Sequence, residues 1–342
     1  MPGRLALLYA AGQGRRGNTT LVRQAAEALR RAGLQADVLI RHSKLGVHRL
    51  LPAMVDWQAM DLSQYHGVVA FNLPAACARH PKRYVLLLER QLQLYEWFGS
   101  NLSPLSHNSR DDRLRSLLIS AENRCLSGAL QVRTLSQTTA DRLEYYLGIK
   151  AQPLRLPSPW RSHIQPGQAA DYLLCPGGFT KRHRPHLLLA LLRALPDSLP
   201  AVVLDLEGDG SRWSALSVED KLRDRVQVLT APDDTTLADV YGRALAVVAL
   251  SLDDEQGYGV MNACYAQKPA YALDDCGAAT EWIEPGITGA VCTSIDHMAS
   301  RIRALIAAGR ISPGMREAAG QRVAGLSFTP LVTELRKYMP GA

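Results

Sequence analysis

Short apolar runs alternate with amphipathic stretches along the chain. The runs suit strands that are buried on both faces, and in the stretches between them apolar residues recur every three or four positions, as in helices. In the first half we expect strands at 5–10, 36–40, 68–72, 84–88 and 131–135 and helices at 21–32 and 138–147. This alternation predicts an α/β protein with parallel sheets.

The pattern stops once and then restarts. Residues 154–171 are rich in proline and polar residues and have no periodicity, so we interpret them as a linker. Beyond them we expect strands at 172–174, 201–207, 226–229, 246–250 and 270–273, and helices at 186–195, 236–244, 259–266, 279–283, 295–308 and 329–338. The length of 342 residues suits two domains of about 150 residues each. We predict a domain over 1–160, a second over 161–325, and a C-terminal helix within 326–342 that is free to pack back on the first domain.

Positive charge is concentrated in the first half of the sequence. Residues 1–150 contain 20 Lys and Arg against 11 Asp and Glu, whereas the rest contains 19 against 21. Such a half would be drawn to an anionic surface such as a membrane or a phosphorylated lipid, although solubilising arginines would give the same count. Nucleic acid is the weakest partner class, because the basic residues are not interleaved with aromatic ones.

No apolar run approaches the roughly 20 residues of a membrane span, and the N-terminus lacks a signal peptide. We therefore expect a cytoplasmic protein, peripheral at most at the inner face of a membrane. The cysteines are scattered, with no C-x-x-C pair, at positions 77, 125, 175, 264, 276 and 292. This spacing argues against a zinc site and against a disulfide framework, and it predicts small buried thiols.

Two small-residue turns stand out between positions 250 and 291. The first follows a predicted strand and contains Asp254 and Gly257; the second follows the next strand and contains Asp275 and Gly277. A strand that passes through such a turn into a helix presents free backbone N–H groups and the positive end of the helix dipole. Both turns are therefore candidate binding sites for a diphosphate.

At these residues the chain resembles the retaining glycosyltransferases of family 4. Their pattern, E-x7-E followed by K/T-P and D-x-G-G-x-x-E, is matched in part by substitutions, at Asp254, Gly257, Asn262, Ala263, Lys268, Pro269, Asp275, Gly277, Glu281 and Gly286. Upstream, 206–213 with Gly208 resembles the family's G-D-G turn, and 135–149 resembles its last N-domain helix. The resemblance implies the GT-B fold, with two Rossmann-like domains facing each other across a cleft, the acceptor bound by the first and the nucleotide sugar by the second.

The resemblance also implies roles for single residues. Asp254, with Glu255 beside it, falls where the family holds the transferred sugar, and Asn262 falls where a glutamate binds the ribose. An asparagine has one carbonyl acceptor where a carboxylate has two charged oxygens, so this substitution weakens donor binding without excluding it. The diphosphate would lie on the amides of Gly277, Ala278 and Ala279, with Glu281 supporting that turn and with Gly257 and Tyr258 beside it.

The family's diphosphate-neutralising arginine and lysine fall on Gly178 and His183. We therefore expect Lys181, Arg182 or Arg184 to supply the positive charge that the leaving group needs. The alternative is that this basic stretch is only the solvated start of a helix.

A second glycine-rich turn lies near the N-terminus. Gly12, Gly14 and Gly17 have the spacing of a dinucleotide-binding fingerprint and also resemble a flavodoxin-like phosphate loop. The acidic residue expected after the second strand is missing, because Arg41 and His42 stand there. A GT-B first domain begins with a similar turn, so we rank a flavin or NAD(P) function below a transferase. Glu89, after another strand, could orient an acceptor hydroxyl, although a surface salt bridge with Arg90 or Arg83 is the simpler expectation.

The sequence thus predicts a retaining glycosyltransferase that moves a sugar from a UDP- or GDP-sugar to a hydroxyl on a glycan or lipid-linked acceptor, in cell-surface glycan or glycoconjugate synthesis. Asp254, Glu255, Lys181 and Arg184 are the expected catalytic residues, with no cofactor and no metal. The alternative is a degenerate glycosyltransferase fold that acts as a binding or scaffold subunit.

Overall fold

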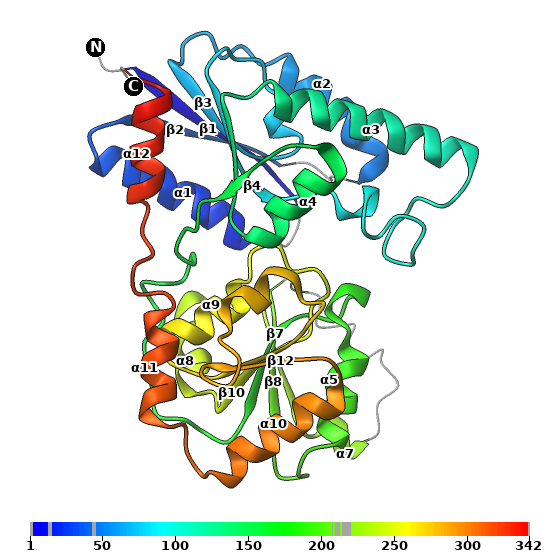
Figure 1. Cartoon of the computed structure of the whole chain (residues 1–342), viewed down its shortest axis with the longest axis vertical. Coiled ribbons are helices and arrows are strands. Elements are labelled where there is room, and N and C mark those ends of the chain that lie inside the picture. Colours follow the sequence, from blue (N-terminus) through cyan, green and yellow to red (C-terminus); the bar gives the residue numbers. More distant parts are fainter. Residues whose placement is uncertain are drawn as a thin grey trace. The chain divides into compact units, whose positions relative to one another are not determined.

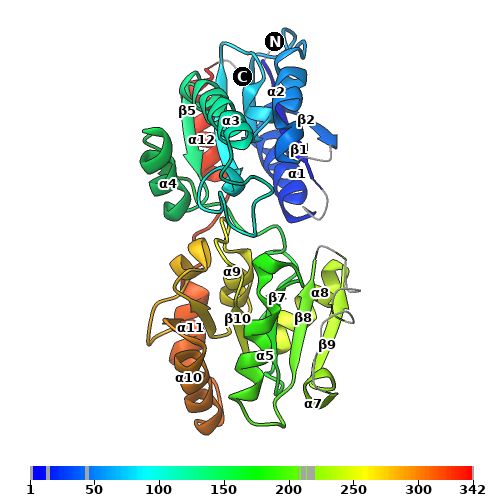
Figure 2. The ribbon, with the colours of Figure 1, turned by 90° about the vertical axis from the view of Figure 1, so that its right-hand side faces the viewer.

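The computed structural model describes residues 3–12, 16–42, 46–206, 208, 213 and 220–340. The chain divides into two compact units, of which unit 1 comprises Met1–Leu156 and Ser327–Ala342 and unit 2 comprises Pro157–Leu326. Each unit is built on a six-stranded parallel sheet with helices packed on it (Figures 1 and 2). The predicted α/β class is confirmed.

The sheet of unit 1 has the order β2-β1-β3-β4-β5-β6. Its strands are β1 (Arg4–Ala11), β2 (Gln35–His42), β3 (Gly67–Asn72), β4 (Arg83–Glu89), β5 (Gln131–Thr134) and β6 (Gln152–Pro153). Every residue of β3 and β4 is buried, which explains the unbroken apolar runs at 68–71 and 84–88 within them. Five of these strands coincide with the apolar runs, and the two-residue edge strand β6 was not predicted.

The helices of unit 1 are α1 (Arg16–Arg31), α2 (Leu50–Gln58), α3 (Ser109–Ser127), α4 (Gln137–Leu147) and α12 (Thr329–Tyr338), with short 3-10 helices η1 (Val47–Arg49), η2 (Ala75–Cys77) and η3 (Leu92–Leu94). The sequence did not predict α3, because only four of its 19 residues are buried and its apolar period is weak. Its first residue is set by Asn108, whose side chain accepts hydrogen bonds from the amides of Arg110 and Asp111. The predicted end of α4 at Gly148 is confirmed, since Gly148 is left-handed with φ 66°.

The C-terminal helix α12 packs on the sheet of unit 1. Glu334 receives two hydrogen bonds from Arg133, at 2.7 and 3.0 Å, and one from the hydroxyl of Tyr84. Met339 is fully buried and covers Gly67, at which a Cβ atom would collide with its sulfur. The chain therefore returns to unit 1 after completing unit 2.

Two cysteines form a disulfide, contrary to the sequence-based expectation. Cys77 in η2 is bonded to Cys125 in α3, 48 residues further along the chain. Spacing could not reveal this pair, because it depends on α3 packing against η2. The other four cysteines are buried thiols, and burial raises the pKa of Cys175, Cys264 and Cys276 to about 12.

The sheet of unit 2 has the order β12-β11-β10-β7-β8-β9. Its strands are β7 (Leu173–Gly177), β8 (Ala201–Asp205), β9 (Val226–Thr230), β10 (Ala246–Ala249), β11 (Ala270–Leu273) and β12 (Gly289–Cys292). The helices are α5 (Pro185–Arg193), α7 (Asp220–Arg223), α8 (Asp234–Arg243), α9 (Tyr258–Tyr265), α10 (Ile295–Ala307) and α11 (Pro313–Gln321), with 3-10 helices η4 (Lys181–His183) and η5 (Gly277–Trp282). Of these, β12, α7, α11 and η4 were not predicted.

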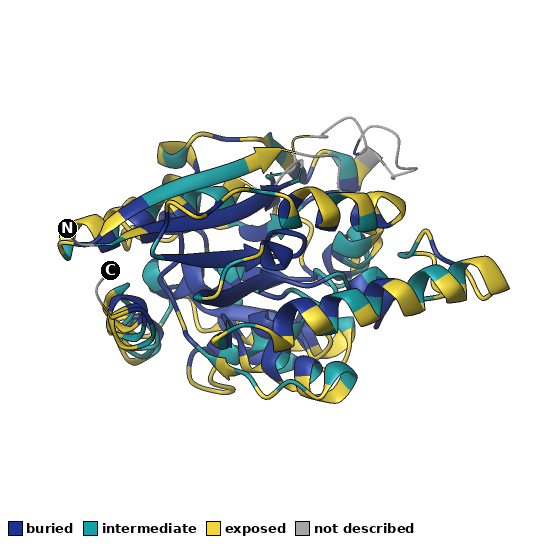
Figure 3. Cartoon of the chain, turned by 90° about the horizontal axis from the view of Figure 1, so that it is seen from above, coloured by how far each residue is buried: buried dark blue, intermediate teal, exposed yellow. Residues whose placement is uncertain are grey.

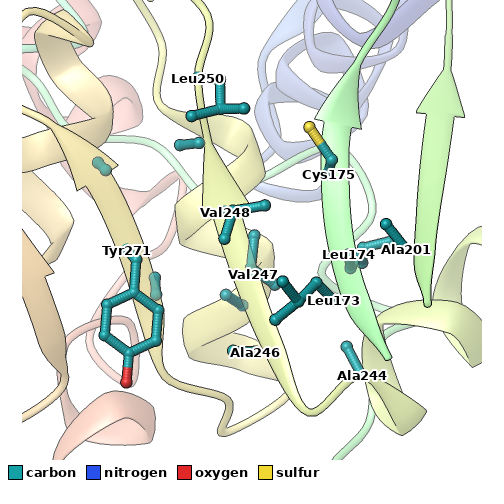
Figure 4. Close-up of a cluster of buried hydrophobic side chains, with 14 of the residues drawn as sticks. Leu173, Leu174, Cys175, Ala201, Ala244, Ala246, Val247, Val248, Leu250 and Tyr271 are labelled. Atoms are coloured by element: carbon teal, nitrogen blue, oxygen red, sulfur yellow. The ribbon is translucent and has the colours of Figure 1, made fainter. Parts of the chain in front are cut away.

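The core of unit 2 is centred on its middle strands. Leu173 and Leu174 of β7 lie beside Val247 and Val248 of β10 (Figure 4), and all four side chains are fully buried. In both units the buried residues gather on the strands and on the inner faces of the helices (Figure 3). Within the described residues, none of the helices combines the length and the apolar character that crossing a membrane requires.

Candidate functional site

The strand order of unit 2 fixes where a ligand can bind. The chain builds β7, β8 and β9 in one direction and then returns to add β10, β11 and β12 on the other side of β7. The direction of winding therefore reverses between β7 and β10, which are parallel neighbours. Ligands of such sheets bind outside the carboxyl ends of the strands at this reversal. The loops that follow β7, β8, β10 and β11 all begin at that edge.

The acidic turn after β10 is closed by its own aspartate. Oδ1 of Asp254 accepts hydrogen bonds from the amides of Gln256 and Gly257, both at 3.1 Å. Gly257 is left-handed, with φ 69°, and a Cβ there would lie 2.8 Å from the carbonyl oxygen of Ala278 and from the ring of Trp282. The neighbouring Glu255 is 4% exposed, so its carboxylate is buried in the turn. Asp254 thus sets the shape of the turn from which α9 starts, with Tyr258 half-buried in its first turn.

The turn after β11 packs directly on the acidic turn. The amide of Ala278 donates to the carbonyl oxygen of Asp254 at 2.7 Å, and that of Asp253 donates to Asp275 at 3.1 Å. Gly277 has φ 58°, and a Cβ there would lie 2.5 Å from the same carbonyl oxygen of Asp254. Only glycines at 257 and 277 allow this close approach.

The amides proposed for the diphosphate differ in their availability. That of Ala278 is engaged by Asp254, and that of Ala279 donates to Cys276 at 3.3 Å. For the Gly277 amide the described residues supply no acceptor. Glu281 is half-buried, and its backbone carbonyl accepts a hydrogen bond from Arg322.

Two arginines of the loop after β7 hold the acidic turn in place. Arg184 forms a bidentate ion pair with Asp275, at 2.5 and 2.7 Å, and donates to the carbonyl of Leu250 at 2.6 Å. Burial lowers the pKa of Arg184, but the hydrogen bond and charge of Asp275 outweigh it and raise that pKa overall. Arg182 donates to the carbonyls of Leu252 and Asp253, at 3.2 and 3.3 Å. Arg184 is therefore paired with a carboxylate and Arg182 is bonded to backbone carbonyls, while Lys181 of the same stretch is exposed.

Gly178 lies between two polar side chains that sequence reasoning did not single out as a pair. A Cβ on Gly178 would be 2.9 Å from Oδ1 of Asp205 and 3.0 Å from Nδ1 of His183. Asp205 ends β8 and is 2% exposed, and His183 is within 3.0 Å of the hydroxyl of Thr180. The only sequence signal for Asp205 was a carboxylate at the end of the apolar run Ala201–Asp205. Its loop continues to Gly208, which is exposed and left-handed, with φ 80°.

Asn262 lies on α9 and faces into unit 2. It is 2% exposed, and its side-chain oxygen accepts a hydrogen bond from the hydroxyl of Ser158 at 2.5 Å. Its side chain also forms a hydrogen bond with the phenol of Tyr241. Burial raises the pKa of Tyr241, and this hydrogen bond offsets only part of that rise. The smaller amide therefore takes part in an internal network at the position where the resemblance implied a glutamate.

At the carboxyl edge of unit 1, Gly12 follows β1 and is half-buried, while Gly14 lies outside the described residues. Beside β1, Asn72 forms two hydrogen bonds with the backbone of Ala10, at 2.8 and 3.1 Å, and donates to Glu89 at 3.1 Å. Asn18 of α1 donates to the other oxygen of Glu89 at 3.2 Å. Glu89 is 6% exposed, so the expected surface salt bridge with Arg90 or Arg83 is wrong.

The neighbouring arginines bond elsewhere. Arg90 pairs with Glu96 at 2.8 Å, and Arg83 donates to the carbonyls of Ala78 and Cys125. The carboxylate of Glu89 is thus held by two amide side chains at the end of a central strand, a role that no sequence motif indicated.

The sequence of unit 2 matches a known family. Residues 160–323 match the family described as glycosyl transferases group 1. The match lies within unit 2 and covers nearly all of it. No curated protein matches the chain in sequence.

Solved structures resemble the chain over nearly its whole length. Sucrose-phosphate synthase from Thermosynechococcus elongatus has a TM-score of 0.78 at 16% identity, with 98% of each chain covered. HepE from Anabaena, solved with UDP and glucose, has a TM-score of 0.69 at 14% identity, again with 98% of each chain covered. WaaG, a glycosyltransferase of lipopolysaccharide biosynthesis, has a TM-score of 0.68 at 13% identity, covering 99% of this chain and 100% of WaaG. The predicted GT-B fold, with two Rossmann-like units, is confirmed.

Proposed function

We propose that this glycosyltransferase moves a sugar from a UDP- or GDP-sugar to a hydroxyl acceptor, with retention of the anomeric configuration. The observation that carries the proposal is the junction of the two glycine turns at the reversal point of a group 1 domain. Retention rests on the resemblance of these turns to family 4. A role in cell-surface glycan or glycoconjugate synthesis is the setting in which we expect the activity.

The donor's diphosphate would lie against the turn at Gly277, whose amide has no acceptor among the described residues. Lys181 is the exposed lysine of the basic stretch that the resemblance places beside the leaving diphosphate, so we assign it the neutralisation of that group. Arg182 and Arg184 act by fixing the turn around Asp254. Asp254 and Glu255 would hold the sugar, and Gly178, Gly208, Tyr258 and Asn262 would border the nucleotide.

Turnover of UDP-, GDP- and ADP-sugars, measured as nucleotide release with simple sugar and lipid acceptors, tests the proposal. We expect one nucleotide to support turnover, and proton NMR of the product would report its anomeric configuration. Lys181→Ala should lower kcat at least tenfold, because one oriented positive charge is lost from the transition state. Asp296→Asn, an exposed acid on α10, is the matched control and should leave kcat unchanged. Failure to bind any of the three nucleotides in calorimetry would refute the proposal.

A binding or scaffold subunit is the second candidate. It is favoured by the internal bonding of Arg182, Arg184 and Asn262, which leaves fewer side chains for the donor than the family pattern provides. Nucleotide binding without turnover of any donor and acceptor pair would support it over the enzyme.

We also propose a peripheral contact between unit 1 and anionic lipid. The outward face of α3 presents Arg110, Arg113, Arg124 and Leu117, whose side chain is 53% exposed. Arg16 is exposed at the start of α1, and Arg15 lies outside the described residues. Charge reversal at Arg15 and Arg16 should reduce co-sedimentation with phosphatidylserine vesicles in low salt. Equal sedimentation of the variant and the parent protein would refute this contact.

A further inference from the structure

A cavity of about 810 Å³ lies in unit 2, away from the candidate donor site. It is bordered by α11, by Arg310 and Ile311 just before that helix, and by Gln267 in the connection between α9 and β11. Gln267 stands three residues before the first residue of β11, so the cavity adjoins the amino end of that strand, whereas the glycine turns follow the carboxyl ends. Helix α11 packs along α9 here (Figure 1). The volume falls within the roughly 300–1,000 Å³ of small-molecule sites.

The cavity wall carries two arginines that the described residues leave without a carboxylate partner. Arg310 and Arg316 line it, and for neither guanidinium do the described residues supply an ion pair or a side-chain hydrogen bond. The one acidic lining residue, Glu317, accepts a hydrogen bond from the amide of Gln321 at 3.2 Å. Polar amides of Gln267 and Gln321 complete the wall.

The charge of Arg316 also acts on a buried lysine. Lys268 follows Gln267, is 1% exposed, and donates to the carbonyl of Gly167 at 3.0 Å, with no carboxylate partner among the described residues. Burial, with a second contribution from the charge of Arg316, lowers the pKa of Lys268 to about 8. An anion bound by Arg310 and Arg316 would offset the charge of Arg316 that lowers the pKa of Lys268.

We propose that this cavity binds a small phosphorylated molecule, with its phosphate on Arg310 and Arg316 and its polar remainder on the amides of Gln267 and Gln321. A phosphate suits two guanidinium groups, because each presents a fork of donors to the oxygens. The site is separate from the donor site, so the proposal does not depend on the proposed transferase activity.

Calorimetric titration of the full chain with inorganic phosphate and with glucose 6-phosphate tests the site. Arg316→Ala should weaken binding at least tenfold, and the double variant Arg310→Ala/Arg316→Ala should abolish it. Arg301→Ala removes the same charge from an exposed position on α10 and should change the affinity less than twofold. Lys181→Ala, at the donor site, should also leave this binding intact. Equal affinity in the double variant and the parent protein, or loss in Lys181→Ala alone, would overturn the proposal.

Proton uptake gives a second readout that needs no variant. Sulfate does not titrate in this range, so the proton count of its binding reports on the protein. Because an anion raises the pKa of a nearby ammonium, sulfate binding at pH 8 should take up a fraction of a proton, measured as a difference in heat between two buffers. At pH 6 the lysine is already charged, and uptake should vanish. Binding at pH 8 without proton uptake would place Lys268 outside the site and overturn its assignment.

Discussion

The junction of the two glycine turns makes a sharp prediction for Gly277→Ala. An alanine at φ 58° costs about 1–2 kcal/mol, because its Cβ approaches the following carbonyl oxygen. The added Cβ would also lie 2.5 Å from the carbonyl oxygen of Asp254, well inside van der Waals contact. The turns must then separate, which stretches the 2.7 Å hydrogen bond from the Ala278 amide, a bond that contributes about 1 kcal/mol. We expect a total loss of about 2–3 kcal/mol in the unfolding free energy of unit 2.

Gly286→Ala is the matched control. Gly286 lies in the same unit and is also left-handed, with φ 83°, but a Cβ there has no neighbour within 4 Å. It should therefore lose only the backbone contribution, about 1–2 kcal/mol. The difference between the two variants isolates the collision between the turns.

Urea denaturation and calorimetric binding of UDP and GDP are the assays. In Gly277→Ala we expect at least tenfold weaker nucleotide binding under conditions where unit 2 is still folded, and in Gly286→Ala unchanged binding. If both variants lose the same stability and bind nucleotide equally well, the close approach at Gly277 does not shape the site, and the reasoning fails.

Three further predictions concern single side chains. Glu334→Gln should destabilise unit 1 by about 2–3 kcal/mol in urea denaturation, because Arg133 and Tyr84 lose a charged acceptor. Its control is Glu27→Gln, at an exposed ion pair of α1, which should cost less than about 0.5 kcal/mol. Similar losses in the two variants would contradict this prediction. Arg184→Lys should lower nucleotide affinity about tenfold and leave the circular dichroism spectrum unchanged. The reason is that a lysine cannot form a bidentate pair with Asp275 and also donate to the carbonyl of Leu250. Unaltered affinity would show that Arg184 does not support the turn. Burial raises the pKa of Glu122, so the folded state favours the protonated form of this side chain. The stability that this provides is lost as pH rises from about 4.5 through the folded-state pKa. Between pH 4 and pH 8 the melting temperature should therefore fall less in Glu122→Gln than in the parent protein, and parallel curves would exclude this role.

Much of the architecture follows from the sequence by itself. The central strands of both sheets are buried on both faces, so their apolar runs stand out against any neighbouring segment, and β1, β3, β4, β10 and β11 were predicted within a few residues. The glycine turns at Gly257 and Gly277 were noticed because each follows an apolar run and precedes a helical stretch, and both glycines are left-handed in the structure.

Only the tertiary structure shows which polar side chains from distant segments bond to one another. The charges of Arg182 and Arg184 were recognised in the sequence, but only the fold shows that they bond to the turn around Asp254 and Asp275. Likewise Glu89 meets Asn72 because the parallel strands β3 and β4 end side by side, and it meets Asn18 because α1 follows the neighbouring strand β1. Periodicity records which face of an element is buried, while the partner of a buried polar group depends on elements far away in the chain. The sequence therefore determined the layers and the turns, and the tertiary structure determined which polar groups are bonded within them.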